Sequence, residues 1–386
     1  MRPVLLVLPL ILLAACKRDD PLPQPTASAE SSVAAASPSP SNDPLASHDG
    51  FAEAADIPDS EARPVMQAQV VLDRLGFTPG VVDGKTGPST RNAIAGFQEA
   101  NELTQTGELD AATKAALARW STIPPTRVVT IPAGFAAGPF AEVPEDPADQ
   151  AKMPALGYES LDEKLAERFH TTVAALAALN PGGVPAGSPS ASAGGATPPV
   201  PHASGEPLFR AGQQLRVPNV GADRIDPGSV KDADWLATLA SLGVGTDQPR
   251  AERVVVSKSK GTLKAYDAAD KLVAVYTATM GSRYDPLPLG EWKINGVDRD
   301  PKFHYNPKLF WDANPGDKAA MLPPGPNGPV GVVWIDLSKP HYGIHGTPNP
   351  ETIGRAESHG CVRLTNWDAA RLAQMVRPGT QVLFEA

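Results

Sequence analysis

Cysteine is nearly absent from this sequence: its 386 residues include only two, Cys16 and Cys361. A scaffold of several disulfides is therefore excluded. Basic residues are also in deficit, since 34 lysines and arginines stand against 43 acidic residues, for a formal net charge of −9. This balance argues against a nucleic-acid partner, because phosphate binding requires clustered lysines and arginines.

Long apolar runs are scarce as well. The apolar run at residues 4–15 is too short to span a bilayer, which takes about 20 residues, but it has the length of a secretory signal. The small residues Ala14 and Ala15 directly before Cys16 resemble the lipobox of bacterial lipoproteins. In that family the cysteine is lipidated and becomes the mature amino terminus. We therefore expect residues 1–15 to be a lipoprotein signal peptide and Cys16 to carry lipid, with an ordinary cleaved signal as the alternative.

Proline, by contrast, is abundant, with 42 residues in the chain, about twice the usual share, and this predicts long linkers. Residues 16–62 contain few large apolar side chains and are predicted to form a disordered tether, because such a stretch cannot bury enough surface to offset its ordering entropy. Residues 122–152 are predicted to be a second linker. Residues 220–250 are predicted to be a connector.

Residues 63–121 show helical periodicity in three short segments, which predicts a small all-α three-helix bundle. Asp83 lies in a glycine-rich turn and Asp110 is placed to cap the third helix; a calcium loop would need more alternating carboxylates. The segment resembles the peptidoglycan-binding domain of cell-wall enzymes, which implies peptidoglycan as a partner. The residues that carry this resemblance include Gln69, Leu72, Gly76, Asp83, Gly84, Gly87, Thr90, Phe97, Gln98, Gly107, Asp110 and Thr113.

Two further amphipathic helices are predicted in residues 153–219, followed by the strand-like sequence LFRAGQQLRVP. This order resembles a lysin motif, a βααβ module that binds glycan. It departs from the motif by a low-complexity insert at residues 182–206 and by Glu159-Ser160 in place of the usual glycine-aspartate. The sequence therefore leaves open a degenerate module that serves only as a spacer.

Residues 251–386 change to an apolar period of two, which predicts a mainly β domain, β-sandwich-like, with one main helix. That helix is expected to begin after Thr365, with Thr365 or Asn366 as its cap. Leu372 and Met375 are expected to face inward. The predicted fold class is thus multidomain: an α bundle, a degenerate βααβ module and a mainly β domain.

The stretch HYGIHGTPNPETIGRAESHGCVRLTN at residues 341–366 holds three of the seven histidines and Cys361. Three interpretations compete. The cysteine could be inert core, or the histidines and the cysteine could bind a metal from loops. A thiol nucleophile activated by a nearby imidazole is the third. Gly360 favours the third, because it frees the backbone to aim successive N–H groups at one developing oxyanion.

The same stretch resembles the active-site motif of the L,D-transpeptidase catalytic domain, a His-Gly followed by a loop and then Ser-His-Gly-Cys-x-Arg. The upstream DPLPLGEWKI is similar to a strand of that family, although the usual Thr-Pro there reads Leu287-Pro288. The resemblance implies Cys361 as the nucleophile and His345 as general base and acid, with no cofactor and no metal. From the residues we expect an imidazole ionisation near pH 6 to 7 to govern the rate.

The resemblance also implies supporting roles around this pair. Oxyanion binding and imidazole orientation would fall to Gly346, His359 and Gly360. Substrate binding would fall to Tyr342, Ser358 and Arg363.

The family's reaction is attack on the carbonyl between meso-diaminopimelate and the terminal D-alanine of a peptidoglycan stem, followed by acyl transfer to an amine. The acceptor would be another stem peptide, giving a 3→3 cross-link, or an outer-membrane lipoprotein. An L,D-carboxypeptidase with the same site is one alternative, and a non-catalytic wall anchor is another. We expect a periplasmic protein of a Gram-negative bacterium whose only hold on the membrane is its lipid, and Lys17 after Cys16 favours the outer membrane over the inner.

Overall fold

A computed structural model describes residues 51, 54, 57–189, 207–221 and 225–386. The predicted signal peptide, the predicted lipidation site Cys16 and most of the predicted tether and low-complexity insert lie outside these residues. Within the described ranges, no helix is both long and apolar enough to cross a membrane.

The predicted three-helix bundle is confirmed and consists of α1 (Pro64–Arg74), α2 (Pro88–Ala100) and α3 (Ala111–Leu117). The Asp110 carboxyl caps α3 by accepting a hydrogen bond from the Thr113 backbone N–H at 2.8 Å. Asp83 accepts from the Lys85 N–H at 2.9 Å inside its turn. Both carboxyls thus have the turn and cap roles predicted for them.

The lysin-motif-like module has the predicted βααβ order, but its first strand lies outside the predicted boundaries. Its elements are β2 (Thr126–Thr130), α6 (Leu161–Arg168), α7 (Val173–Leu179) and β3 (Gln214–Pro218), and β2 and β3 pair antiparallel. β2, α4 (Ala133–Ala136) and α5 (Pro147–Gln150) all lie in the stretch predicted as a linker. That prediction is corrected: Val129 and Ile131 are buried in the module core, although prolines flank them in the sequence.

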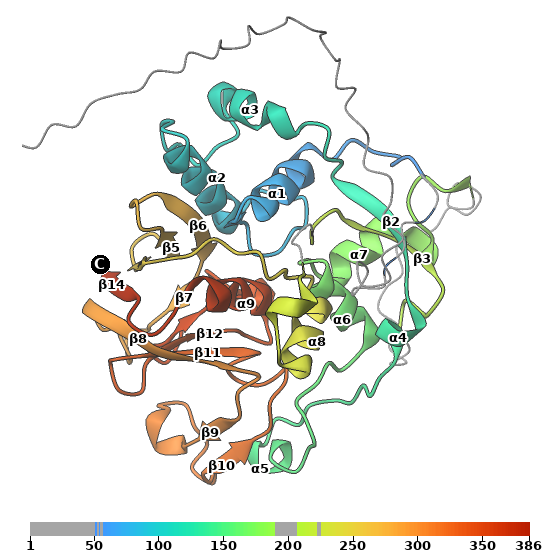
Figure 1. The fold of residues 1–386 in the computed structure, drawn as a ribbon. Helices are drawn as coiled ribbons and strands as arrows, with labels where there is room; N and C mark the ends of the chain where they lie inside the picture. The colour runs from blue at the N-terminus through green and yellow to red at the C-terminus, as the bar shows by residue number, and fades with distance from the viewer. Residues whose placement is uncertain (1–50, 52–53, 55–56, 190–206, 222–224) are drawn as a thin grey trace, which may run out of the picture. The chain divides into compact units, whose positions relative to one another are not determined.

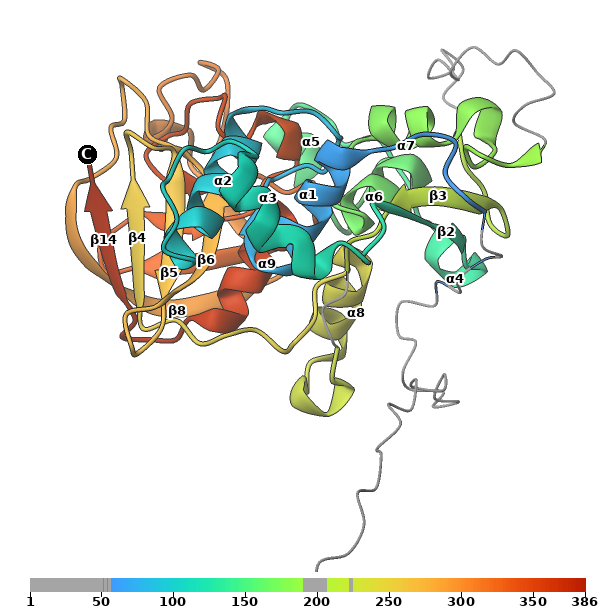
Figure 2. The same ribbon diagram turned by 90° about the horizontal axis from the view of Figure 1, so that it is seen from above.

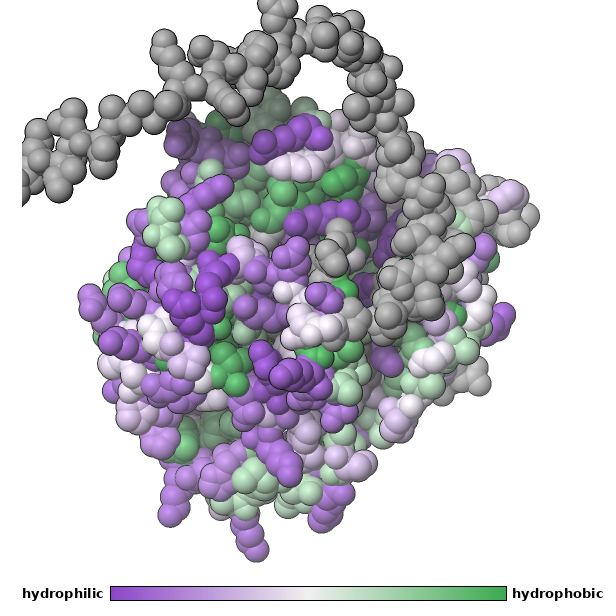
Figure 3. Space-filling model, viewed as in Figure 1, coloured by the Kyte–Doolittle hydropathy of each residue, from purple (hydrophilic) through white to green (hydrophobic). Residues whose placement is uncertain are grey.

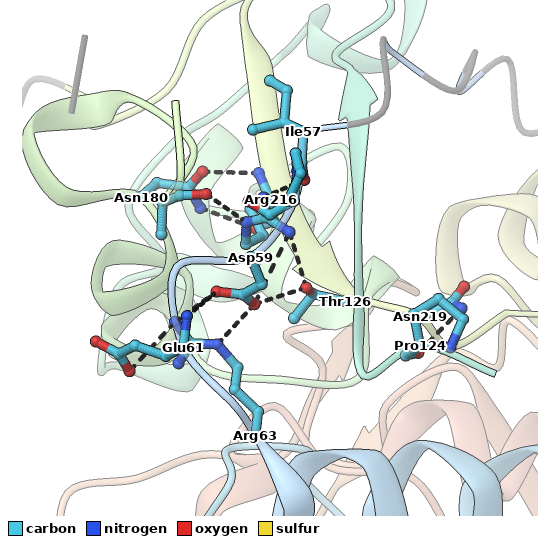
Figure 4. Close-up of polar contacts among 11 residues, drawn as sticks. Ile57, Asp59, Glu61, Arg63, Pro124, Thr126, Asn180, Arg216 and Asn219 are labelled. Atoms are coloured by element: carbon cyan, nitrogen blue, oxygen red, sulfur yellow. Dashed lines mark hydrogen bonds and ion pairs between the residues drawn. The ribbon is translucent and has the colours of Figure 1, made fainter. Parts of the chain in front are cut away.

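The last residues of the predicted tether also form specific contacts, so the tether prediction is wrong for residues 57–62. The Arg216 guanidinium donates to the carbonyls of Ile57 and Pro58 at 2.7 and 3.2 Å, and Thr126 donates to the Asp59 carboxyl at 3.0 Å (Figure 4). Phe51, further upstream, is buried. These polar anchors hold a short segment that has few large apolar side chains of its own.

The C-terminal domain is mainly β, as predicted, and most of its strands join with β1 in one ten-stranded sheet of order β1-β6-β5-β4-β14-β8-β11-β12-β13-β7. The long strand β8 pairs with β14 through residues 290–293 and with β11 through residues 294–299, so it links two halves of the sheet. A small separate sheet holds β9 (Phe303–Tyr305) and β10 (Ala320–Leu322). The strands of the large sheet are β1 (Phe77–Thr78), β4 (Arg253–Ser257), β5 (Thr262–Tyr266), β6 (Leu272–Thr277), β7 (Thr279–Met280), β8 (Gly290–Arg299), β11 (Val333–Leu337), β12 (Gly343–His345), β13 (Val362–Arg363) and β14 (Gln381–Glu385).

Two helices complete the core of this domain. The predicted main helix is α9 (Asn366–Met375), and Thr365 caps it by accepting from the Asp368 N–H at 3.1 Å. The second, α8 (Ala233–Leu242), lies in the predicted connector. The connector prediction is corrected because Trp235 and Leu239 of α8 are buried in the same apolar cluster as α9 and the sheet.

A strand from the helix-bundle segment belongs to the large sheet. β1, which follows α1, pairs in parallel with β6 at the edge of the large sheet, and α2 lies against β6 (Figures 1 and 2). Gly96 of α2 makes this approach possible, since a Cβ there would lie 2.6 Å from a Val275 methyl. Hydrophilic residues predominate on the face shown in Figure 3, with apolar residues between them in separate patches.

Candidate active site

Strand pairing brings the two central residues of the sequence motif, Cys361 and His345, to the same cavity. β12 and β13 are parallel neighbours, with Ile344 opposite Val362 and His345 opposite Arg363. Cys361 directly precedes β13 and His345 ends β12. Both line a cavity of about 910 Å³, which is also lined by Tyr342, His359 and Arg363.

His345 is buried and is held in one tautomer. Its Nδ1 lies 2.7 Å from the carbonyl oxygen of Gly346; because a carbonyl only accepts, Nδ1 carries the hydrogen and Nε2 keeps its lone pair. The Trp334 ring stacks on the imidazole with centroids 5.6 Å apart. Burial, followed by the charge of Arg363, lowers the pKa of His345 to about 3. The imidazole is therefore neutral at neutral pH, which differs from the ionisation near 6 to 7 expected from the sequence.

Cys361 is a partly buried free thiol whose Sγ lies 3.8 Å from the carbonyl oxygen of His341. Burial raises the pKa of the thiol, and this outweighs the opposite effects of a Gly343 backbone hydrogen bond and the Arg363 charge. The resting site thus holds a neutral thiol and a neutral imidazole rather than a thiolate–imidazolium pair.

Gly360 is required by the geometry of the turn that presents the thiol. Its φ of +97° is a left-handed conformation, and a Cβ there would lie 2.6 Å from Cε1 of Tyr342. The Tyr342 ring, which lines the cavity, therefore packs directly on the backbone that precedes Cys361.

His359 also lines the cavity, and both of its ring nitrogens are engaged. Nε2 lies 2.7 Å from the Asp312 carboxyl, and Arg363 donates to Nδ1 at 3.4 Å. Because guanidinium only donates, Nδ1 accepts and Nε2–H donates to Asp312. The rings of Phe310 and Trp311 lie against the imidazole. His359 thus links the loop before β10 to Arg363.

Ser358 differs from its predicted role in substrate binding. It is buried, and its hydroxyl accepts from the Gly281 N–H and donates to the Cys361 carbonyl, both at 2.6 Å. Both hydrogen-bonding functions of the hydroxyl are thereby used. Ser358 fixes the turn before β13 against β7, and we revise its role from substrate contact to support of the Cys361 backbone.

The sequence prediction did not include Asn366 and Trp334 among the site residues. Asn366 was expected only as an alternative helix cap, but Thr365 takes that role and the Asn366 amide lies against the backbone of Gly346 instead. Trp334 lies opposite His345 in the pairing of β11 with β12. Strand alternation around Trp334 was the available signal, but register between strands is not readable from one sequence.

A cysteine and a carbonyl-anchored histidine line one cavity in a mainly β domain, so the site offers a thiol and an imidazole base to the same bound molecule. Comparison with known proteins names the family. Residues 251–383 match the L,D-transpeptidase catalytic domain, and residues 61–117 match a peptidoglycan binding domain.

Among curated relatives, a Bacillus licheniformis protein named L,D-transpeptidase YkuD is 40% identical over 130 residues, which cover 34% of this chain and 63% of that protein. A Bacillus subtilis protein named L,D-transpeptidase YqjB is 30% identical over 135 residues, covering 34% of this chain and 69% of that protein. A solved L,D-transpeptidase from Mycobacterium smegmatis aligns with a TM-score of 0.29 at 20% identity, over 35% of this chain and 59% of that chain. This chain belongs to the L,D-transpeptidase family. It spans less than two thirds of the length of the Bacillus licheniformis relative.

Proposed function

We propose that the protein is a peptidoglycan L,D-transpeptidase that acts by acyl transfer through Cys361. The observation that carries this proposal is that Cys361 and His345, at the paired strands β12 and β13, line the same cavity. The family match of the C-terminal domain supports the reaction class. The match of the helix bundle to a peptidoglycan binding domain supports peptidoglycan as the substrate.

The first half of the reaction follows from the protonation states. Because the thiol is neutral at rest, its proton must be removed as the sulfur attacks, and Nε2 of His345 is the base whose lone pair is free. The sulfur bonds to the carbonyl carbon between meso-diaminopimelate and D-alanine. The oxyanion faces the backbone N–H groups of Gly360 and Cys361. The C–N bond then breaks, His345 returns the proton to the leaving amine, and D-alanine departs from a thioester.

The second half reverses these roles with another nucleophile. An acceptor amine attacks the thioester carbonyl and gives a proton to His345 as the new C–N bond forms. The C–S bond breaks, and the sulfur takes that proton back as the neutral thiol. Arg363 and Tyr342 bind the substrate in this proposal, which their position in the cavity lining supports. Within the family's chemistry the acceptor is a second stem peptide, giving a 3→3 cross-link, or an outer-membrane lipoprotein.

A location in the periplasm, with lipid on Cys16 and attachment to the outer or the inner membrane, is part of the same proposal. Its support is the lipobox-like sequence before Cys16, outside the described residues. Mass analysis of the amino-terminal peptide from the native host tests it. A diacylglyceryl-modified Cys16 is expected, and a mature chain that begins elsewhere would contradict it.

The reaction is tested by incubating tetrapeptide-rich peptidoglycan with the purified protein and analysing the muropeptides by mass spectrometry. We expect dimers that have lost one D-alanine, and no such product with Cys361→Ala. Tripeptides without dimers would identify a carboxypeptidase with the same site. Binding to sacculi without any product would identify a wall anchor, and equal turnover by Cys361→Ala would remove the thiol mechanism.

A further inference from the structure

We propose that Glu167, in the lysin-motif-like module, is a positioning residue of the active site that acts through Asn366 on the Gly346 carbonyl. This inference rests on the proposed function. Glu167 belongs to α6, about 180 residues before the histidine that it would help to place, and it does not line the cavity.

The first step is the contact between Asn366 and Gly346. A Cβ on Gly346 would lie 2.2 Å from the Asn366 side-chain oxygen, and a Cβ on Gly331 would lie 1.9 Å from it. The amide is thus wedged between two glycine backbones, and its oxygen accepts from the Val332 N–H at 3.3 Å. Since the Gly346 carbonyl holds His345, the place of this amide determines where the imidazole can lie.

The second step is the orientation of that amide. Its nitrogen donates to a carboxyl oxygen of Glu167 at 2.9 Å and to the carbonyl of Pro326 at 3.1 Å. A flipped amide would set its NH₂ group against the Val332 N–H and its oxygen against the Glu167 carboxyl. Glu167 therefore supplies an acceptor for the observed orientation, the same orientation that the Val332 N–H requires.

The third step is that Glu167 is itself held rigidly. It is buried, and the Tyr158 hydroxyl donates to its other carboxyl oxygen at 2.9 Å. The same part of the module holds the loop at residues 323–331, since Leu156 donates to the Pro324 carbonyl at 2.9 Å and Asn327 donates to the Gly157 carbonyl at 3.0 Å. Pro329 and Val330 of that loop line the cavity. The module thus forms part of the support of the active site, beyond any contact it makes with glycan.

Glu167→Ala is the direct test. It removes one acceptor, leaves the buried amide nitrogen with the Pro326 carbonyl alone and so weakens the hold on the amide. Because a 1 Å misplacement of a catalytic group can cost about 100-fold, we expect kcat to fall about 10- to 100-fold. KM should change little, since Glu167 does not reach the cavity. Glu167→Gln keeps an oxygen for Asn366 and should restore kcat to near the wild-type value.

Leu165→Ala is the matched control, because Leu165 lies two residues from Glu167 in the same helix, α6. It is fully buried in the apolar core of the lysin-motif-like module, not in the cluster of the sheet and α9. It should lower stability without lowering kcat. The second readout is the Nδ1–H proton resonance of His345 in a ¹⁵N-histidine sample, which reports the hydrogen bond to Gly346 without substrate. This resonance should shift in Glu167→Ala and stay in place in Glu167→Gln and Leu165→Ala.

The inference is overturned if Glu167→Ala keeps the wild-type kcat and resonance, or if Leu165→Ala loses kcat equally. If Glu167→Ala does not fold, Glu167→Asp replaces it, since the shorter side chain withdraws the carboxyl from Asn366 and should lower kcat in the same way. A wild-type protein without turnover would contradict the proposed function alone. The His345 resonance would then decide the inference.

Discussion

Arg371 of α9 donates from both terminal guanidinium nitrogens to the carboxyl of Asp73 in α1, at 3.0 and 3.1 Å. His170 of the lysin-motif-like module lies 3.2 Å from the same carboxyl, and its ring stacks on Trp367. Three segments far apart in the sequence thus meet at one buried acid. Burial alone would raise the pKa of Asp73, but the charges of Arg371 and His170 outweigh it and hold the pKa well below its ordinary value.

Arg371→Met should lower the free energy of unfolding by about 3 to 5 kcal/mol, because it leaves the buried Asp73 carboxylate without its main countercharge. Urea unfolding followed by circular dichroism measures this. Arg377→Met is the control, since Arg377 pairs with Glu252 in an exposed bridge, and surface pairs contribute about 0 to 1 kcal/mol. An equal decrease in the free energy of unfolding in the two variants would mean that the buried Arg371–Asp73 pair does not stabilise the contact between α9 and α1.

The pH dependence of the active-site pair should differ from that of a thiolate–imidazolium pair. Alkylation of Cys361 by a neutral reagent should rise only in the alkaline range, because burial raises the pKa of the thiol. No step is expected between pH 6 and 7, because the pKa of His345 is lowered to about 3. His345→Ala should leave this curve nearly unchanged yet lower turnover about 10²- to 10⁴-fold, the usual contribution of a general base. A wild-type step near pH 6.5 would instead show a preformed ion pair.

Glu167→Gln should change how stability depends on pH. Burial raises the pKa of Glu167 from 4.5 to about 8, with Glu163 and Glu351 adding to the effect. Between these values the folded protein holds a proton that the unfolded chain has lost, so stability falls as pH rises, by up to about 1.4 kcal/mol per pH unit. Glutamine does not titrate and removes this slope. Thermal unfolding from pH 5 to 8 should therefore show the stability of Glu167→Gln increasing relative to that of the wild type as the pH approaches 8.

Asp368 shares part of this window, since burial raises its pKa to about 7, but it titrates in both proteins and leaves their difference unaffected. Parallel curves for the two proteins would mean that Glu167 is ionised in the fold throughout.

Gly360→Ala should abolish most turnover, because the new methyl would lie 2.6 Å from the Tyr342 ring and would force the backbone before Cys361 to move. Gly379→Ala is the control, because it introduces a similar left-handed backbone strain without a steric clash. Gly379 has nearly the same φ, +93° against +97°, but its added Cβ would have no atom within 4 Å. Muropeptide turnover should be near wild type in Gly379→Ala. Similar activity in both variants would mean that the Tyr342 contact does not constrain the thiol.

Local signals in the sequence predicted the elements whose ends depend on neighbouring residues. Asp110 and Thr365 cap their helices as expected, because a side-chain acceptor and the first-turn N–H groups lie within three residues of each other. The motif that holds Cys361 and His345 is compact in sequence, so both could be named as candidates, and both line the cavity. The prediction of residues 57–62 as tether failed for the opposite reason, because their partner Arg216 lies far along the chain.

Elements that depend on distant partners could not be predicted in this way. β2 has its partner β3 more than 80 residues later, so residues 126–130 looked like part of a linker. Ser358 lay in the catalytic motif, yet its hydroxyl binds the backbone of Gly281 and Cys361 rather than the cavity. The raised pKa of Glu167 likewise depends on burial against a domain whose sequence begins far downstream.

The two-residue strand β1 has a consequence for any attempt to isolate the C-terminal domain. Phe77 and Thr78 cover the outer edge of β6, so a fragment that begins at residue 251 would present β6 as a bare edge with unpaired N–H and C=O groups. Such edges recruit strands from other molecules. Excised alone, the domain should self-associate in a concentration-dependent way, and a short peptide that carries the β1 sequence should compete with that association.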